Sequence, residues 1–279
     1  MYRKNLDFFR YIAFSTIFGR LMLIPIRFFY ASRDELKAWK RIVSYTFFSK
    51  EYDNFTYDLT VLNKEHLSHY ISCITGISHK KVRMYFREIE GDFLLRKHLN
   101  TCIDTGFLRY CTDKSMFYGR RIGWYALVRI AKPKLVIESG VDKGLGACII
   151  TAALKRNTQE GKMGRYIGLD INPMSGKLFS SPYTDYGKFI CMNSHTYLKK
   201  MKEPVDMFIH DSDHSFSHES REYELIKNRL SKDAYVLSDN AHSSQALNLF
   251  AAKMNKRFLF FKEVPSNHWY KGAGIGVAW

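Results

Sequence analysis

Short apolar segments alternate with helical segments from residue 134 to the end of the chain, and this alternation limits the possible folds more than any other feature. The segments that look like strands are 134–138, 166–170, 189–192, 205–210, 234–238, 257–262 and 274–278. Helical spacing fills intervals such as 147–155, 217–230 and 245–254. Strands that alternate with helices predict a parallel sheet with right-handed crossovers.

The last two predicted strands, 257–262 and 274–278, have no helical segment between them. Their link is too short for the crossover that a parallel pair needs, so one of these strands should run antiparallel to its neighbours. We therefore predict a Rossmann-like α/β fold, with a seven-stranded, mostly parallel sheet that ends in a C-terminal antiparallel hairpin.

The chain before this sheet has a different character, with helical spacing and few glycines. We predict a helical N-terminal region over residues 1–117 and an α/β domain over residues 118–279. Ser32 and Ser78 each precede charged residues in the manner of a helix N-cap, so each is expected to open a helix. The role of the helical region stays open between a lid, a dimer arm and a membrane foot.

A glycine-rich loop follows the first predicted strand, where open α/β sheets bind their ligands. Glycine lets the backbone turn tightly and approach a ligand closely. A glycine loop can also be an ordinary turn between a strand and a helix, so it is weak evidence by itself. The candidate binding residues in and beside this loop are Glu138, Gly140, Asp142, Gly144 and Gly146.

Polar residues also follow the second and third predicted strands. Asp170 ends the second strand, where a carboxylate can accept hydrogen bonds from both hydroxyls of a ribose. Asn193 and Ser194 follow the third strand, at a position suited to contact with an adenine ring. A helix cap and turn chemistry are the alternative explanations for these residues. Their order along the chain favours a nucleoside site.

These motifs together resemble those of class I S-adenosylmethionine-dependent methyltransferases, over roughly residues 119–279. The resemblance rests on Glu138-x-Gly140-x-x-x-Gly144, Asp170, Asn193-Ser194 and Asp211. Residues 205–242 are similar to the metal-dependent O-methyltransferases, which include catechol O-methyltransferase and the bacterial sugar and macrolide enzymes. The resemblance implies that S-adenosylmethionine is bound by Glu138, Gly140, Asp142, Gly144, Gly146, Asp170, Ile171, Asn193, Ser194 and Asp211.

Oxygen-bearing side chains end the fourth and fifth predicted strands, at Asp211, Asp239 and Asn240. Such ligands suit Mg²⁺ or Ca²⁺. Catechol O-methyltransferase holds Mg²⁺ with the same residue types at the corresponding tips, so the resemblance implies a Mg²⁺ site here. Some sugar-modifying relatives carry a second Asp where this chain has Asn240.

A methyl acceptor also needs a base near its hydroxyl group. His214 lies three residues after Asp211, where the catechol enzyme has a lysine, and is the first candidate. His242 is the second candidate, and Asp211 is counted with the catalytic group. Either histidine could instead be a structural, hydrogen-bonded group. The following residues Arg221, Glu222 and Glu224 are expected on an ordinary helix surface.

The chain is strongly basic, with 43 Lys and Arg against 27 Asp and Glu and a formal net charge of +16. Nucleic acid, an anionic membrane and an acidic substrate are the partners that such a charge suggests. Nucleic acid is not supported, because Arg-Gly repeats and zinc-finger spacing are absent from the sequence. A generally basic surface is the plain alternative.

Residues 8–30 are apolar and aromatic but are interrupted by Arg10, Arg20 and Arg27. These charges leave no apolar run of ~18 residues, so a spanning helix is not expected. The segment could lie on a membrane surface, or pack on the catalytic domain or on a second subunit of a homo-oligomer.

Five cysteines, with no CxxC pair, indicate a reduced, cytoplasmic protein that could be membrane-peripheral. Cys148 and Cys191 are expected in the core. The predicted function is Mg²⁺-assisted O-methyl transfer to a hydroxyl of a saccharide or other small secondary metabolite. The alternative is a non-catalytic or RNA-directed methyltransferase-fold protein associated with a membrane or nucleic acid.

Overall fold

A computed structural model describes residues 2–113 and 116–279 of the chain, with the backbone alone for residues 2–6 and 9. The chain divides into two compact units. The first contains Met1–Ser49 and Asn267–Trp269, and the second contains Lys50–Ser266 and Tyr270–Trp279.

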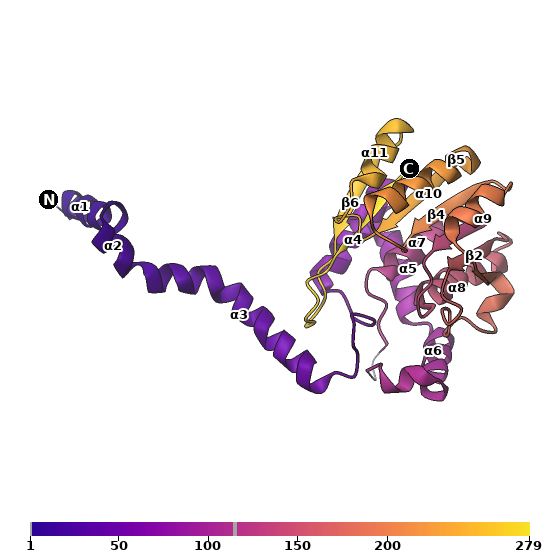
Figure 1. The fold of residues 1–279 in the computed structure, drawn as a ribbon, viewed down its shortest axis with the longest axis horizontal. Helices are drawn as coiled ribbons and strands as arrows, with labels where there is room; N and C mark the ends of the chain where they lie inside the picture. The colour runs from indigo at the N-terminus through magenta and orange to yellow at the C-terminus, as the bar shows by residue number, and fades with distance from the viewer. Residues whose placement is uncertain (1, 114–115) are drawn as a thin grey trace. The chain divides into compact units, whose positions relative to one another are not determined.

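The second unit is built on a seven-stranded sheet in the order β3-β2-β1-β4-β5-β7-β6 (Figure 1). Neighbours among β1 to β5 are parallel, whereas β7 runs antiparallel to both β5 and β6. The predicted fold is therefore confirmed. The strands are β1 (Leu135–Ser139), β2 (Arg165–Asp170), β3 (Gly187–Cys191), β4 (Val205–His210), β5 (Leu230–Asp239), β6 (Phe258–Lys262) and β7 (Gly274–Ala278).

Side chains alternate between the two faces of the sheet and so build two hydrophobic cores. On β1, Val136 belongs to one core, while Leu135 and Ile137 belong to the other. The first core includes residues of α7 (Arg121–Ala131) and α8 (Leu145–Gln159). The second includes residues of α9 (Ser194–Lys200), α10 (Phe216–Ile226) and α11 (Ala246–Lys253). The 3-10 turns η2 (Tyr183–Tyr186) and η3 (Lys227–Arg229) precede β3 and β5.

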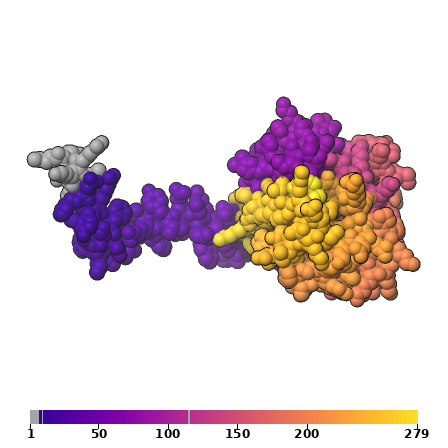
Figure 2. Space-filling model, turned by 90° about the horizontal axis from the view of Figure 1, so that it is seen from above, coloured from indigo at the N-terminus to yellow at the C-terminus, as the bar shows by residue number. Residues whose placement is uncertain are grey.

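Part of the predicted helical region belongs to the same compact unit as the sheet. Its elements are α4 (Val61–Thr75), α5 (His79–Glu90), α6 (Phe93–Thr105) and the 3-10 turn η1 (Phe107–Tyr110). Fully buried residues of α4, such as Leu67 and Ile71, share the first core with α7 and α8. Helix α4 also contacts β6, and Figure 2 shows this purple segment packed beside the yellow C-terminal strands. The boundary at residue 117 stays a prediction.

The first unit consists of α1 (Tyr2–Ser15), α2 (Ile17–Met22) and α3 (Ile24–Phe48). The expectation that Ser32 opens a helix is wrong. Ser32 lies inside α3, where its hydroxyl donates to the Phe28 carbonyl at 2.6 Å, and the start signal is Pro25 in the first turn. Ser78 does cap α5, because its side chain accepts a hydrogen bond from the Lys81 amide. Among residues 2–113 and 116–279, no helix combines the length and apolar character needed to cross a bilayer.

Two further expectations need correction or refinement. Cys148 is buried as expected, but Cys191 is exposed because it ends the edge strand β3. The fifth strand starts at Leu230, earlier than the apolar run 234–238, because polar residues of its first part continue the extended backbone.

Candidate cofactor and metal site

The ends of four strands, β1 to β4, meet around one cavity of about 110 Å³ at the carboxyl edge of the sheet. Loop residues after β1, β2 and β3 line it together with residues that follow β4. This brings together five residues that the sequence predicts for cofactor binding: Gly140, Asp170, Ile171, Asn193 and Ser194. The cavity lies where an open α/β sheet binds ligands.

Asp170 holds the glycine loop against the end of β2. One carboxylate oxygen accepts hydrogen bonds from the amides of Val141 and Asp142 at 3.0 and 3.1 Å. The other oxygen accepts from the Asn172 amide at 2.9 Å. Burial raises the pKa of the Asp170 carboxyl, but these backbone donors outweigh burial and lower it below its usual value. Asp170 is therefore a charged acceptor at the cavity wall.

The loop needs glycine at position 140 for two reasons. Gly140 has a φ of 89°, in the left-handed region that side chains disfavour. A Cβ atom at this position would also overlap the carbonyl group of Asp211, which follows β4. The close approach of the two loops therefore depends on the missing side chain.

We expect Gly140→Ala to displace the loop, and to lower the unfolding free energy by more than the ~1–2 kcal/mol of a left-handed alanine alone. Gly161→Ala is a matched control, because Gly161 has a φ of 76° and open space around its Cα. Urea unfolding of both variants measures the difference. Equal losses in the two variants would contradict the packing argument.

Glu138 lies beneath the loop rather than on the cavity wall. Its side chain is buried and accepts a hydrogen bond from the Tyr166 hydroxyl. Burial raises the pKa of Glu138 to about 8, although the Tyr166 hydrogen bond acts in the opposite direction. The absence of a side chain at Gly146 makes room for this carboxylate. The roles predicted for Glu138 and Gly146 in cofactor binding stay predictions.

Asp142 and Lys143 face a second, larger cavity of about 670 Å³, which Tyr52, Phe107 and Met174 also line. The Lys143 ammonium group is held by Asp53 at 2.8 Å and by Asp142 at 3.1 Å. Gly144 has a φ of 94° and caps α8. These contacts fix the rest of the glycine loop.

The tips of β4 and β5 bring Asp211, His214 and Asp239 together, with one potential ligand atom from each within 4.8 Å of the others. The carboxyl groups of Asp211 and Asp239 are hydrogen-bonded to each other. His214 Nε2 lies 3.9 Å from Asp211 Oδ1 and 2.9 Å from Asn240 Nδ2. Asn240 has a φ of 54°, in the left-handed region that Asn adopts more readily than most residues.

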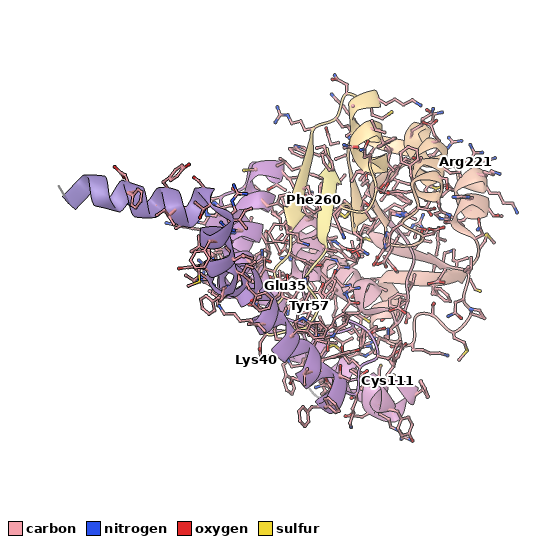
Figure 3. All side chains as sticks on the ribbon, turned by 60° about the vertical axis from the view of Figure 1, so that its left-hand side comes forward. Glu35, Lys40, Tyr57, Cys111, Arg221 and Phe260 are labelled. Atoms are coloured by element: carbon pink, nitrogen blue, oxygen red, sulfur yellow. The ribbon has the colours of Figure 1, made fainter. Side chains whose placement is uncertain are left out.

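Sequence reasoning missed the arginine that neutralises Asp239. Arg120 precedes α7, is buried, and donates to both carboxylate oxygens of Asp239. It also contacts Glu263 at 3.0 Å and the Tyr57 hydroxyl, and Tyr57 is labelled in Figure 3. Burial raises the pKa of Asp239, but Arg120 outweighs burial and lowers it to about 2.

The pair of carboxyl groups is electrostatically unequal. Burial and the neighbouring Asp239 raise the pKa of Asp211 well above its usual value. Arg121 lies 4.0 Å from Asp211 and offsets only part of this effect. His214 Nδ1 is buried without a hydrogen-bond partner among the described residues. The cluster of Asp211, Asp239, His214 and Asn240 offers two carboxylates, an imidazole and an amide, which fit a divalent cation. Such a cation would share Asp239 with Arg120.

The two candidate bases differ in their surroundings. His214 is half-buried beside Asp211, and burial lowers its pKa, which favours the neutral form that can accept a proton. His242 is exposed on the loop after β5. Asp213 is exposed and accepts a hydrogen bond from the Ser215 amide at 2.9 Å, an arrangement typical of a turn. The geometry therefore favours His214.

The expectation that Glu222 lies on the helix surface is wrong. Its side chain is fully buried and accepts hydrogen bonds from Ser139 Oγ at 2.5 Å and His210 Nδ1 at 2.6 Å. His218, which lines the 110 Å³ cavity, lies 3.2 Å from the same carboxylate. Glu222 thus ties α10 to the ends of β1 and β4. By contrast, Arg221 is exposed at the edge of the molecule (Figure 3).

Comparison with known proteins now adds to this geometry. Residues 137–241 match a family model described as a methyltransferase domain. These residues run from β1 to just beyond β5 and contain both the cavity and the two strand tips. The chain contains an S-adenosylmethionine-dependent methyltransferase domain. Comparison with curated protein sequences gave no match.

Several solved structures resemble this methyltransferase domain. Cofactor-bound Rv0187 from MTB has a TM-score of 0.51 and 14% identity, covering 67% of this chain and 90% of its own. A candidate O-methyltransferase from Klebsiella pneumoniae has a TM-score of 0.50 and 13% identity, with the same coverage. The O-methyltransferase from Bacillus cereus in complex with SAH has a TM-score of 0.49 and 14% identity, again covering 67% and 90%. At these identities the likeness shows the fold.

Proposed function

We propose that the chain transfers a methyl group from S-adenosylmethionine to a hydroxyl oxygen, with Mg²⁺ held at the tips of β4 and β5. The observation that carries this proposal is that five predicted cofactor residues from three strand ends line one cavity. A cluster of two carboxylates and a histidine, Asp211, Asp239 and His214, follows the next two strands. Solved proteins of this fold include a candidate O-methyltransferase, which favours oxygen as the acceptor atom.

S-adenosylmethionine supplies an electrophilic methyl group on a sulfonium. In this proposal Asp170 accepts hydrogen bonds from the ribose hydroxyls, for which its charged state is suited. Asn193 and Ser194 contact the adenine ring, and Gly140 lets the backbone approach the nucleoside closely. The cavity of about 110 Å³ is smaller than the ~300 Å³ of typical ligand pockets, so it would enclose only part of the cofactor.

Bound Mg²⁺ would polarise the acceptor hydroxyl and lower its pKa. Asp211, Asp239 and Asn240 would hold it. Three buried or half-buried carboxylates, Asp211, Asp239 and Glu263, face the guanidinium groups of Arg120 and Arg121. Arg120 pairs with Asp239 and Glu263, so Asp211 is the least compensated of the three, and a bound cation would favour its ionised form. His214 would accept the acceptor's proton at Nε2, the nitrogen that faces Asp211, once Asn240 Nδ2, which lies 2.9 Å from this nitrogen, no longer donates to it.

A metal held at the tips of β4 and β5 could bind two neighbouring oxygens of a methyl acceptor. We propose a hydroxyl of a saccharide or of a small secondary metabolite. For residues 8–30, two predicted partners remain open: a membrane surface and a second copy of the chain. The proposed site lies wholly in the second compact unit and depends on neither partner.

The proposal is tested by calorimetric titration of S-adenosylhomocysteine into the full chain, with Mg²⁺ and with EDTA. We expect binding under both conditions and tighter binding, or a separate metal signal, with Mg²⁺. Absence of binding overturns the enzyme assignment and favours the non-catalytic alternative. Binding without any response to metal leaves a metal-independent transferase. Transfer of a labelled methyl group to RNA instead of a saccharide or catechol panel would assign the RNA-directed alternative.

A further inference from the structure

The first compact unit exposes an unusual number of large apolar side chains. Phe14, Phe18 and Phe28 are 59%, 71% and 69% exposed, and most of their apolar neighbours in residues 8–30 are also exposed. Soluble surfaces rarely carry contiguous apolar patches of this kind unless a partner covers them.

The charged residues between positions 8 and 33 of this unit are all positive. Residues 8–33 contain four arginines, Arg10, Arg20, Arg27 and Arg33, and contain no aspartate, glutamate or lysine. All four arginine side chains are exposed. A long arginine side chain can lay its stem along an apolar surface while its charge reaches a polar layer.

Helix α3 continues this pattern beyond residue 33. Phe29, Leu36 and Val43 recur every seven residues, so they lie along one side of the helix, and each is about half exposed. Arg33, Lys37 and Arg41 recur every four residues and form a basic stripe beside this apolar stripe, with Asp34 lying 3.6 Å from Arg33 and 3.8 Å from Lys37. A basic stripe beside an aromatic and aliphatic face is typical of a helix that lies in a membrane interface.

We propose that residues 8–48 bind the surface of an anionic lipid bilayer and hold the methyltransferase domain there. A bilayer offers both an apolar layer for the phenylalanines and negative headgroups for the arginines. A second copy of the chain fits less well, because residues 8–48 of each copy carry seven Lys and Arg residues against two carboxylates, Asp34 and Glu35. The segment lies on the bilayer rather than across it, since no helix among the described residues can span one.

The test is co-sedimentation of the full chain with vesicles of phosphatidylcholine, alone or mixed with phosphatidylglycerol. We expect binding to the mixed vesicles at least about tenfold stronger than to the neutral ones, and weakened by added salt. The triple variant Arg10→Gln, Arg20→Gln, Arg27→Gln should lose most of this preference. The triple variant Phe14→Glu, Phe18→Glu, Phe28→Glu should lose binding to both vesicle types.

A matched control substitutes exposed apolar residues of the second unit, Met163→Glu and Leu249→Glu, which are 77% and 51% exposed. This control should bind vesicles like the parent chain. Thermal unfolding of all variants shows whether the second unit remains folded. Absence of binding to the mixed vesicles overturns the proposal. In that case, a dimer in sedimentation equilibrium would identify a second copy of the chain as the partner of residues 8–48, and retention by RNA would identify nucleic acid. The titration with S-adenosylhomocysteine tests the proposed methyltransferase activity, and vesicle binding tests the role of residues 8–48. Either experiment can fail without affecting the result of the other.

Discussion

The Asp211→Asn variant should bind Mn²⁺ at least ~100-fold more weakly than the parent chain. Changes beyond the first ligands of a metal already cost ~10–100-fold in affinity, so loss of a direct carboxylate ligand should cost no less. Asp211 contributes one of the two carboxylates that face each other at the strand tips, and Asn keeps its shape while removing its charge. Mn²⁺ is a paramagnetic stand-in for Mg²⁺, so its spectrum reports binding without any methyl acceptor.

Asp213→Asn is the matched control, since Asp213 is exposed and two positions further along the same loop. Its Mn²⁺ affinity should stay within a few fold of the parent value. Both variants should retain S-adenosylhomocysteine binding if Asp211 acts mainly through the metal. Equal Mn²⁺ affinity in the parent chain and Asp211→Asn would remove Asp211 from the metal site. A parent chain that binds no Mn²⁺ would remove the site altogether.

The sheet could be predicted because its signals are local. Residues 134–138 form a short apolar run, and β1 indeed covers Leu135–Ser139. The missing helix between residues 262 and 274 directly limits how β6 and β7 can connect. The grouping of the residues predicted for the cofactor follows from the same logic, because parallel strands place their carboxyl ends at one edge of the sheet. Asp170 and Asn193 thus meet at a single cavity although 23 positions of sequence separate them.

The residues that prediction missed depend on distant parts of the chain. Glu222 has the sequence neighbours of a surface residue, and only the packing of α10 against β1 and β4 buries it beside Ser139 and His210. Arg120 lies 119 positions before Asp239 and 143 before Glu263. No local pattern marks such a partner. The exposure of Cys191 likewise follows from the position of β3 at the edge of the sheet.

Removal of the Arg120 guanidinium should cost about 3–5 kcal/mol of unfolding free energy, because a broken buried ion pair leaves a charge without compensation. In Arg120→Met the side-chain stem is largely kept. Asp239 and Glu263 then remain almost fully buried and lose their shared cation. Urea unfolding followed by circular dichroism measures this loss.

Two comparison variants show whether the loss of unfolding free energy in Arg120→Met comes from the buried ion pair. Arg165→Met removes an ion pair with Glu203 whose side chains are 41% and 65% exposed, and it should cost no more than ~1 kcal/mol. The double variant Arg120→Met, Asp239→Asn should recover part of the loss, because it removes the charge that the first substitution leaves unpaired. If Arg120→Met costs as little as Arg165→Met, Asp239 is uncharged without the arginine. The buried pair would then contribute positioning of the β5 tip and little stability.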